Sequence, residues 1–121
     1  MTPVCLFRSG NFTLHSGLET FWKIDCDGLT WADWYTLARM AALEFLPAFG
    51  EVEGVPRGGI PFANALEQYG VRGGPLLIAD DVCTTGASLE KQRAGRAALG
   101  VVVFARGRVP SWVTPLFQMP N

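Results

Sequence analysis

The sequence lacks the features that mark several large classes of protein. Its three cysteines, Cys5, Cys26 and Cys83, are odd in number and widely spaced, with no CxxC or similar pattern, which argues against a disulfide framework and a zinc site. It also has no apolar run of membrane-spanning length, and no basic start followed by a long apolar stretch. We therefore expect a soluble protein in a reduced, cytoplasmic environment, with no membrane partner.

Charged residues are scarce as well. They make up 17% of the 121 residues, against 49% apolar residues, and the formal net charge is −1. This balance excludes a disordered chain and predicts no broad surface for nucleic acid. No internal repeat, charge block or low-complexity segment divides the chain. We expect one domain over residues 1–121, because this length is enough to bury a hydrophobic core without staples.

The order of the expected elements is typical of an α/β protein. Residues 11–25 alternate aromatic and polar side chains around a turn near Gly17, which predicts a hairpin. Thr30 is a suitable helix cap, and the apolar spacing after it predicts a helix from Trp31 to near Pro47. The remaining elements are a strand at 52–55, a helix from Pro61 to Gly70, a strand at 76–79, a helix at 87–99 and a strand at 101–104.

Strands and helices that alternate in this way pair in parallel through right-handed crossovers. The expected fold is a small parallel (Rossmann-like) sheet flanked by helices and preceded by a hairpin. Residues 1–28 would form the hairpin, 29–106 the α/β core, and 107–121 a C-terminal tail that is irregular apart from one edge strand. Exposed sheet edges and many aromatic residues in so small a protein suggest a homodimer.

Polar residues gather where the central strand is expected to end, which is where open parallel sheets bind ligands. Asp80 and Asp81 offer carboxylates for sugar hydroxyls and for a magnesium ion shared with a pyrophosphate. A hydroxyl-rich turn then opens a helix, and its unpaired amides suit a phosphate. A capped helix after a buried strand would explain the same residues without a ligand. The turn comprises Thr84, Thr85, Gly86, Ala87 and Ser88.

A second loop, Val55–Pro61, also lies between a strand and a helix. Arg57 supplies a permanently charged fork for pyrophosphate oxygens, and Gly58 and Gly59 allow backbone amides to face an anion. The alternative is a tight turn with a surface arginine. The pattern GxxxxGK[ST] does not occur, which disfavours an ordinary nucleotide triphosphatase.

Both segments resemble motifs of one family. Residues 76–88, LLIADDVCTTGAS, resemble the phosphoribosyl pyrophosphate signature of the type I phosphoribosyltransferases. Residues 54–61, GVPRGGIP, look like the pyrophosphate loop of that family, whose backbone often includes a non-proline cis peptide. Residues 12–17, FTLHSG, are similar to the N-terminal hood of the orotate phosphoribosyltransferases. The resemblance implies a compact type I phosphoribosyltransferase fold with a hairpin hood.

The resemblance also implies roles for the candidate residues. Asp80 and Asp81 would hold the ribose hydroxyls and, together with substrate and water, Mg²⁺. The turn from Thr84 to Ser88 would bind the 5-phosphate. The pyrophosphate would meet Arg57, Gly58 and Gly59, and the base would meet Arg106 and the hood residues His15, Ser16, Gly17, Phe21 and Trp22.

Several of these assignments have a plain structural alternative, and the hood departs from the family at one position. Arg106 could equally be a solvated charge at a strand end, and the hood aromatics could be core residues. His15, the only histidine, stands where the orotate enzymes have a lysine. A lone histidine on a hairpin is more often a surface or packing residue, although a protonated one can donate to an anion.

A feature of the family is missing, which keeps three functions open. Family members carry additional strands and a mobile catalytic loop where this chain has only residues 70–75.

The first of the three functions is that of a phosphoribosyltransferase, which moves ribose 5-phosphate to a nitrogenous base and releases pyrophosphate. The base would be orotate or a similar pyrimidine, with a purine still open. The second is a non-catalytic module that binds phosphoribosyl pyrophosphate or a nucleotide and regulates a partner, and the third is a structural or interaction protein. The two phosphate loops and the hood favour the first.

Overall fold

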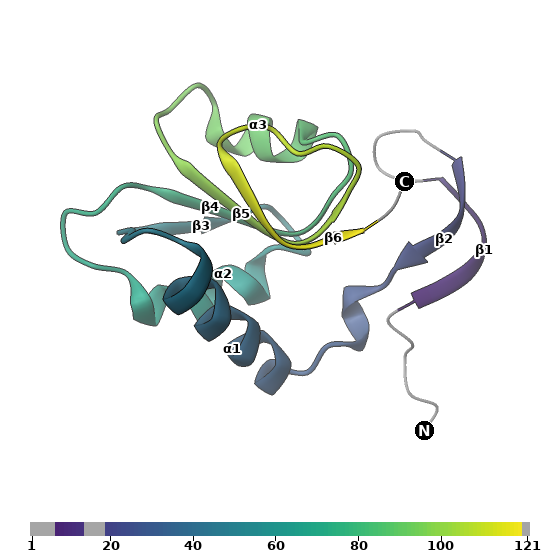
Figure 1. Ribbon diagram of the computed structural model, residues 1–121, viewed down its shortest axis with the longest axis horizontal. Coiled ribbons are helices and arrows are strands. Elements are labelled where there is room, and N and C mark those ends of the chain that lie inside the picture. The colour runs from purple at the N-terminus through teal and green to yellow at the C-terminus, as the bar shows by residue number, and fades with distance from the viewer. Residues whose placement is uncertain (1–6, 14–18, 120–121) are drawn as a thin grey trace.

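A four-stranded parallel sheet forms the centre of the molecule, in the order β3–β4–β5–β6 (Figure 1). The computed structural model describes residues 7–13 and 19–119. Each strand pairs in parallel with its neighbours, so the α/β class and the parallel sheet expected from the sequence are confirmed. The strands are Val52–Gly54 (β3), Leu77–Cys83 (β4), Leu99–Arg106 (β5) and Val113–Met119 (β6).

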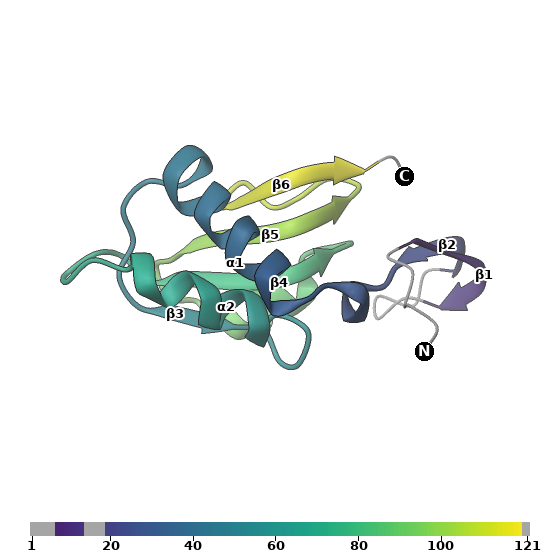
Figure 2. The ribbon, with the colours of Figure 1, turned by 90° about the horizontal axis from the view of Figure 1, so that it is seen from below.

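An antiparallel hairpin precedes the sheet, as the alternating pattern predicted. Its strands are Phe7–Thr13 (β1) and Glu19–Ile24 (β2), and it begins earlier than expected. Figure 2 shows the hairpin beyond the carboxyl ends of the parallel strands, where a hood over a ligand would lie. The turn with His15, Ser16 and Gly17 lies outside the described residues, and so do the side chains of Phe21 and Trp22.

The first helix begins where its cap predicted. The Thr30 hydroxyl accepts from the Asp33 amide at 3.2 Å and the Asp33 carboxylate from the Thr30 amide at 2.8 Å, a capping box. Helix α1 (Trp31–Met40) continues as the wider turns of η2 (Ala41–Phe45). Phe45, at the end of these wider turns, is 42% exposed.

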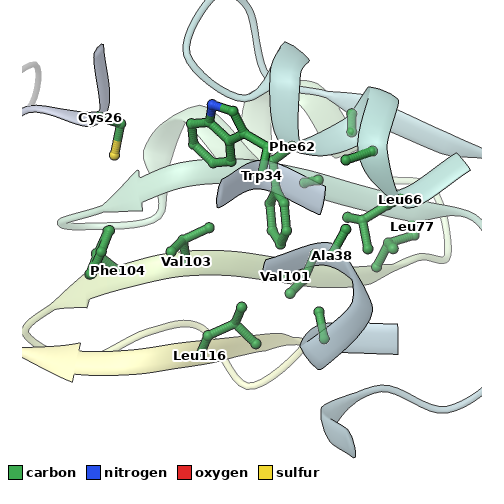
Figure 3. Packing of buried hydrophobic residues seen from close by; sticks show 14 of the residues in the cluster. Cys26, Trp34, Ala38, Phe62, Leu66, Leu77, Val101, Val103, Phe104 and Leu116 are labelled. Atoms are coloured by element: carbon green, nitrogen blue, oxygen red, sulfur yellow. The ribbon is translucent and has the colours of Figure 1, made fainter. Parts of the chain in front are cut away.

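Helices cover both faces of the sheet, so its central strands are buried and apolar over most of their length, at residues 77–79 in β4 and 101–105 in β5. Helices α1 and α2 (Ile60–Leu66) pack on one face, where Trp34 meets Phe62 at a ring distance of 5.9 Å (Figure 3). Helix α3 (Ala87–Arg93) packs on the other face through Leu89. The described helices include none with the length and apolar character needed to cross a membrane.

The third helix is shorter than the sequence analysis predicted. It was expected to run to Leu99 and to stop at Gly100, but it ends at Arg93, where Ala94 and Gly95 take the left-handed conformation. Gly100 lies inside β5 instead, and its amide donates to the Trp112 carbonyl at 2.9 Å. The tail beyond β5 supplies the expected edge strand, β6, where Pro115 is tolerated.

The two helical crossovers have opposite hands. Both advance in the same direction along the sheet, from β3 to β4 and from β4 to β5, yet α2 and α3 lie on opposite faces. Figure 2 shows that the β3–α2–β4 unit is the left-handed one. The expectation of right-handed crossovers was therefore wrong for this unit, although about 98% of such connections are right-handed.

The left-handed unit is closed by direct backbone contact. The short helix η3 (Glu67–Tyr69) continues α2, and residues 70–76 lead from it directly to β4. The amide of Val71 donates to the Phe49 carbonyl at 2.7 Å. The Gly50 amide donates to the Pro75 carbonyl at 2.8 Å. A Cβ on Gly74 would lie 2.6 Å from the carbonyl carbon of Phe49 and 2.7 Å from the Gly50 nitrogen. Only glycine allows the two segments to approach so closely.

We expect Gly74→Ala to lower the free energy of unfolding by about 2 kcal/mol or more, because backbone atoms must separate to admit the methyl group. Gly73→Ala is the matched control, since Gly73 has a positive φ of 80° but open space around its Cβ position. It should cost only about 1 kcal/mol. Urea unfolding of both variants measures the difference, and equal losses would contradict the role of this contact.

Candidate functional site

The two motif loops meet at the carboxyl edge of the sheet, because β3 and β4 are neighbours there. A Cβ built on Gly58 would overlap the Asp81 carboxylate and would lie 2.8 Å from its Cγ atom. The loop backbone therefore lies directly against this carboxylate. The sequence analysis assigned the two segments to one ligand, and the fold brings them into contact.

The loop after β3 is tightly held at both of its ends. The Val55 amide donates to the Ala79 carbonyl at 2.8 Å, and the Gly59 amide donates to the Val55 carbonyl at 2.8 Å. The peptide bond between Pro56 and Arg57 is cis, as the family resemblance implied. Arg57 is exposed, and its guanidinium has no hydrogen-bond or ion-pair partner among the described residues. It is available to an anion.

The carboxylates lie within β4, although the strand was expected to end at residue 79, before both of them. The strand continues to Cys83, and Asp80 is aligned with Val102 of β5. Asp80 is only 6% exposed, and Asp81 is partly buried. The strand can carry both because their oxygens accept from backbone amides, Asp80 Oδ1 from Asp81 and Asp81 Oδ1 from Val82, each at 2.8 Å.

Burial gives the pair an unusual protonation. Burial raises the pKa of Asp80 to about 8, and the hydrogen-bonded, negatively charged Asp81 carboxylate adds to the effect. At neutral pH the pair therefore retains a proton when nothing is bound. Binding of a cation or other positive charge at these oxygens would favour release of that proton.

Cys26 is a neighbour of the carboxylates that the sequence analysis did not find. It lies in the short helix η1 (Cys26–Gly28), between the hairpin and α1, and is buried (Figure 3). Burial, and then the charge of Asp81, raise the pKa of its thiol. Burial and then Asp80 also raise the pKa of the Cys83 thiol. Both thiols are thus neutral packing groups, and an isolated cysteine carries no local signal of such a contact.

The hydroxyl-rich turn opens α3 as expected. Gly86 is the helix cap at φ 88°, and the Ala87 amide approaches the Thr85 hydroxyl oxygen at 3.3 Å. Thr85, Ala87 and Ser88 are exposed, which leaves this turn accessible. Gly86 itself is buried beneath Pro110, a contact from the C-terminal tail that local sequence could not indicate.

Arg106 is the last residue of β5, two residues beyond the end expected for this strand. It lies at the same carboxyl edge as the two loops and is partly buried, and burial lowers the pKa of its guanidinium. Two residues before it, Phe104 stacks on Phe117 of β6 with a ring distance of 5.5 Å.

The donor set fits a magnesium ion only if the ligand supplies part of its coordination. Among the described residues, no cluster of three or more histidine, cysteine or acidic side chains has the arrangement of a metal site. Asp80 and Asp81 are neighbouring oxygen donors at this edge. Mg²⁺ is commonly held by one or two carboxylates together with substrate phosphates and water, which matches this pair.

We expect the contribution of Asp80 to the free energy of unfolding to fall as the pH rises from about 4 to about 8. In this range folded Asp80 keeps a proton that the unfolded chain releases, so rising pH favours unfolding. Asp80→Asn should flatten this dependence and raise the Tm at pH 8 by at least about 4 °C. Thermal unfolding at several pH values measures this, with the exposed Asp27→Asn as control. A destabilised Asp80→Asn variant at pH 8 would contradict it.

Comparisons with known proteins agree with this architecture. The chain aligns with orotate phosphoribosyltransferase from Aeropyrum pernix at 23% identity and a TM-score of 0.71, over 93% of this chain and 88% of that one. The orotate phosphoribosyltransferase of Mycobacterium tuberculosis H37Rv, in complex with Fe(III) dicitrate, aligns at 18% identity and a TM-score of 0.64. The alignment covers 93% of this chain and 89% of that one. UMP synthase of Leishmania donovani aligns at 21% identity and a TM-score of 0.73, over 94% of this chain and 34% of that one.

Similarity at the level of sequence is weaker. No protein-family model matches the chain, and no curated protein matches it either. The structural similarity extends over nearly the whole chain and includes the hairpin, the parallel sheet and its helices. The chain thus has the fold of the orotate phosphoribosyltransferases, a compact type I phosphoribosyltransferase fold.

Proposed function

We propose that the protein binds phosphoribosyl pyrophosphate together with Mg²⁺ and transfers ribose 5-phosphate to a nitrogenous base, releasing pyrophosphate. The observation that carries the proposal is the contact between the Gly58 backbone and the Asp81 carboxylate at the carboxyl edge of the sheet. That contact brings the loop that we propose for pyrophosphate next to a carboxylate that we propose for ribose. The fold shared with orotate phosphoribosyltransferases supports the same function.

Each part of this substrate has a chemically suitable partner. The ribose hydroxyls suit the carboxylates of Asp80 and Asp81, which accept hydrogen bonds. The pyrophosphate suits the exposed guanidinium of Arg57 and the neighbouring glycine amides. The 5-phosphate suits the hydroxyl-rich turn from Thr84 to Ser88, where α3 begins and where Thr85 and Ser88 are exposed.

The residues of this chain would act mainly by electrostatics and position. As pyrophosphate leaves the ribose C1 atom, positive charge develops on the sugar ring, in a state comparable to that of glycoside hydrolysis. The Asp80 and Asp81 carboxylates would stabilise that charge, and Arg57 would stabilise the departing anion. Bound Mg²⁺ would supply further neutralisation of pyrophosphate. The hairpin beyond the strand ends would exclude water, which competes with the base (Figure 2).

A pyrimidine such as orotate is the base we propose. Two observations support it: the structural neighbours are named as orotate phosphoribosyltransferases, and Arg106 lies at the same edge as the ribose site. A cationic, partly buried arginine suits an anionic base better than a neutral one.

We also propose a homodimer. It would bury the outer face of α1, where Trp31 is 75% exposed and Tyr35 is 47% exposed.

A second candidate is a binding module without turnover. The direct link of residues 70–76 between α2 and β4 favours it, because a loop that closes over the substrate is expected there in catalytically active relatives. Such a module would hold phosphoribosyl pyrophosphate or a nucleotide at the same residues and would pass the signal to a partner.

Calorimetric titration with phosphoribosyl pyrophosphate and Mg²⁺ tests binding, and a pyrophosphate-release assay on the same samples tests transfer. We expect binding, and release that depends on an added base, with orotate as the first base tried and other pyrimidines and purines as alternatives. Binding without release would favour the binding module. Absence of binding would rule out both functions.

Arg57→Ala should weaken binding of phosphoribosyl pyrophosphate about tenfold or more and leave ribose 5-phosphate affinity nearly unchanged, because a charge-assisted contact to pyrophosphate is lost. Arg72→Ala is the matched control, since Arg72 is also exposed but lies in the link before β4, at the opposite edge of the sheet. Calorimetry with both ligands measures the difference. Equal losses for the two ligands would show that Arg57 has no selective role at pyrophosphate.

A further inference from the structure

The tail segment between β5 and β6, residues 107–112, returns across the face of the sheet that carries α3 (Figure 1). Because β6 is parallel to β5, the chain must run back along the full length of the sheet before β6 begins. The segment has no helix of its own. It packs instead on α3 and on the turn that opens α3.

Trp112 joins this segment to α3 through Glu90. The indole Nε1 donates to Glu90 Oε1 at 2.6 Å, and Arg93 Nη2 donates to Glu90 Oε2 at 2.7 Å. The Arg93 guanidinium also lies 4.3 Å from the centroid of the Trp112 ring. The indole packs closely on Gly100 of β5, where a Cβ would lie 2.8 Å from its Cζ3 atom. These contacts fix the segment against both the helix and the sheet.

Pro110 extends the same packing to the hydroxyl-rich turn. A Cβ on Gly86 would lie 2.6 Å from Pro110 Cγ and 2.9 Å from Cδ, so the proline ring lies directly on the Gly86 backbone. The Pro110 carbonyl accepts from the Val113 amide at 3.0 Å, which links its position to the start of β6. The turn is thus covered on one side by the tail, while Thr85 and Ser88 remain exposed.

We propose that Pro110 and Trp112 are positioning residues that hold the turn from Thr84 to Ser88 in its phosphate-binding shape. The inference rests on the proposed function, because it assigns this turn to the 5-phosphate. Helix α3 has only seven residues, and a helix so short is not stable by itself. The amides of the turn are therefore ordered by tertiary contacts, and those from the tail reach both Gly86 and Glu90. A preordered turn binds phosphate without first losing conformational entropy.

The first test is Trp112→Phe, which keeps an aromatic ring over Gly100 but removes the donor to Glu90. We expect its affinity for ribose 5-phosphate to fall about five- to tenfold, the effect of losing one charge-assisted hydrogen bond. Its affinity for pyrophosphate with Mg²⁺ should stay within about twofold, because pyrophosphate binds at the Arg57 loop. Calorimetry with the two ligands measures both affinities.

The control is Arg96→Gln. Arg96 also ties the α3 region to the sheet, through Glu53 at 2.7 Å, but it does not contact the tail segment. It should lower thermal stability and leave ribose 5-phosphate affinity unchanged. If Trp112→Phe and Arg96→Gln weaken ribose 5-phosphate binding equally, the tail contributes general stability only, and the proposal is overturned.

A conservative pair at Glu90 separates the hydrogen bond from the charge. Glu90→Gln keeps an acceptor for the Trp112 indole and should retain most of the ribose 5-phosphate affinity, whereas Glu90→Ala should lose as much as Trp112→Phe. Amide hydrogen exchange adds a measurement without ligand. The amides of Ala87, Glu90 and Ala94, which are hydrogen-bonded to Thr85, Gly86 and Glu90, should exchange faster in Trp112→Phe than in the wild type or Arg96→Gln, and unchanged exchange would overturn the proposal.

The outcomes distinguish this proposal from the proposed function. If the wild type binds neither phosphoribosyl pyrophosphate nor ribose 5-phosphate, the proposed function fails, and the phosphate role of the tail fails with it, whatever the exchange rates. If the wild type binds both and Trp112→Phe binds both equally well, only the positioning role fails.

Discussion

The constraint on which the structure depends is the burial of a carboxyl group inside the central strand. Asp80 lies within β4 at 6% exposure, and its oxygen accepts from the next amide along the chain. Burial of an ionised carboxylate is unfavourable, so the group keeps a proton at neutral pH. An energetic cost of this kind at a strand end is typical of a binding site, because packing alone would favour an apolar residue.

The second constraint is steric, and it sets how the loops surround that carboxyl pair. The Gly58 backbone lies against the Asp81 carboxylate, and Pro110 lies on Gly86. A side chain at either glycine would push a loop away from the edge of the sheet. The site is therefore assembled from backbone contacts, and the loops after β3 and β4 and the tail before β6 depend on one another.

The left-handed crossover shows how a small chain keeps this edge intact. In a parallel sheet the loop after β3 and the carboxylates of β4 are adjacent only if the two strands pair directly. The chain achieves this with a direct link from α2 to β4, closed by the contact between Gly74 and Gly50. Close backbone packing between Gly74 and Gly50 compensates for the unfavourable left-handed crossover. The arrangement keeps the loop after β3 against the Asp81 carboxylate of β4.

Local pattern in the sequence determined the hairpin, the start of α1 at Thr30, the parallel sheet and both motif loops, because caps, alternation and apolar runs act over a few residues. It did not determine the end of α3, the depth of Asp80 in β4 or the hand of the first crossover. Those depend on contacts between distant segments. Only the tertiary structure placed Pro110 on Gly86, Trp112 on Glu90 and Cys26 near the carboxylates, since no local signal encodes which remote residues share a space.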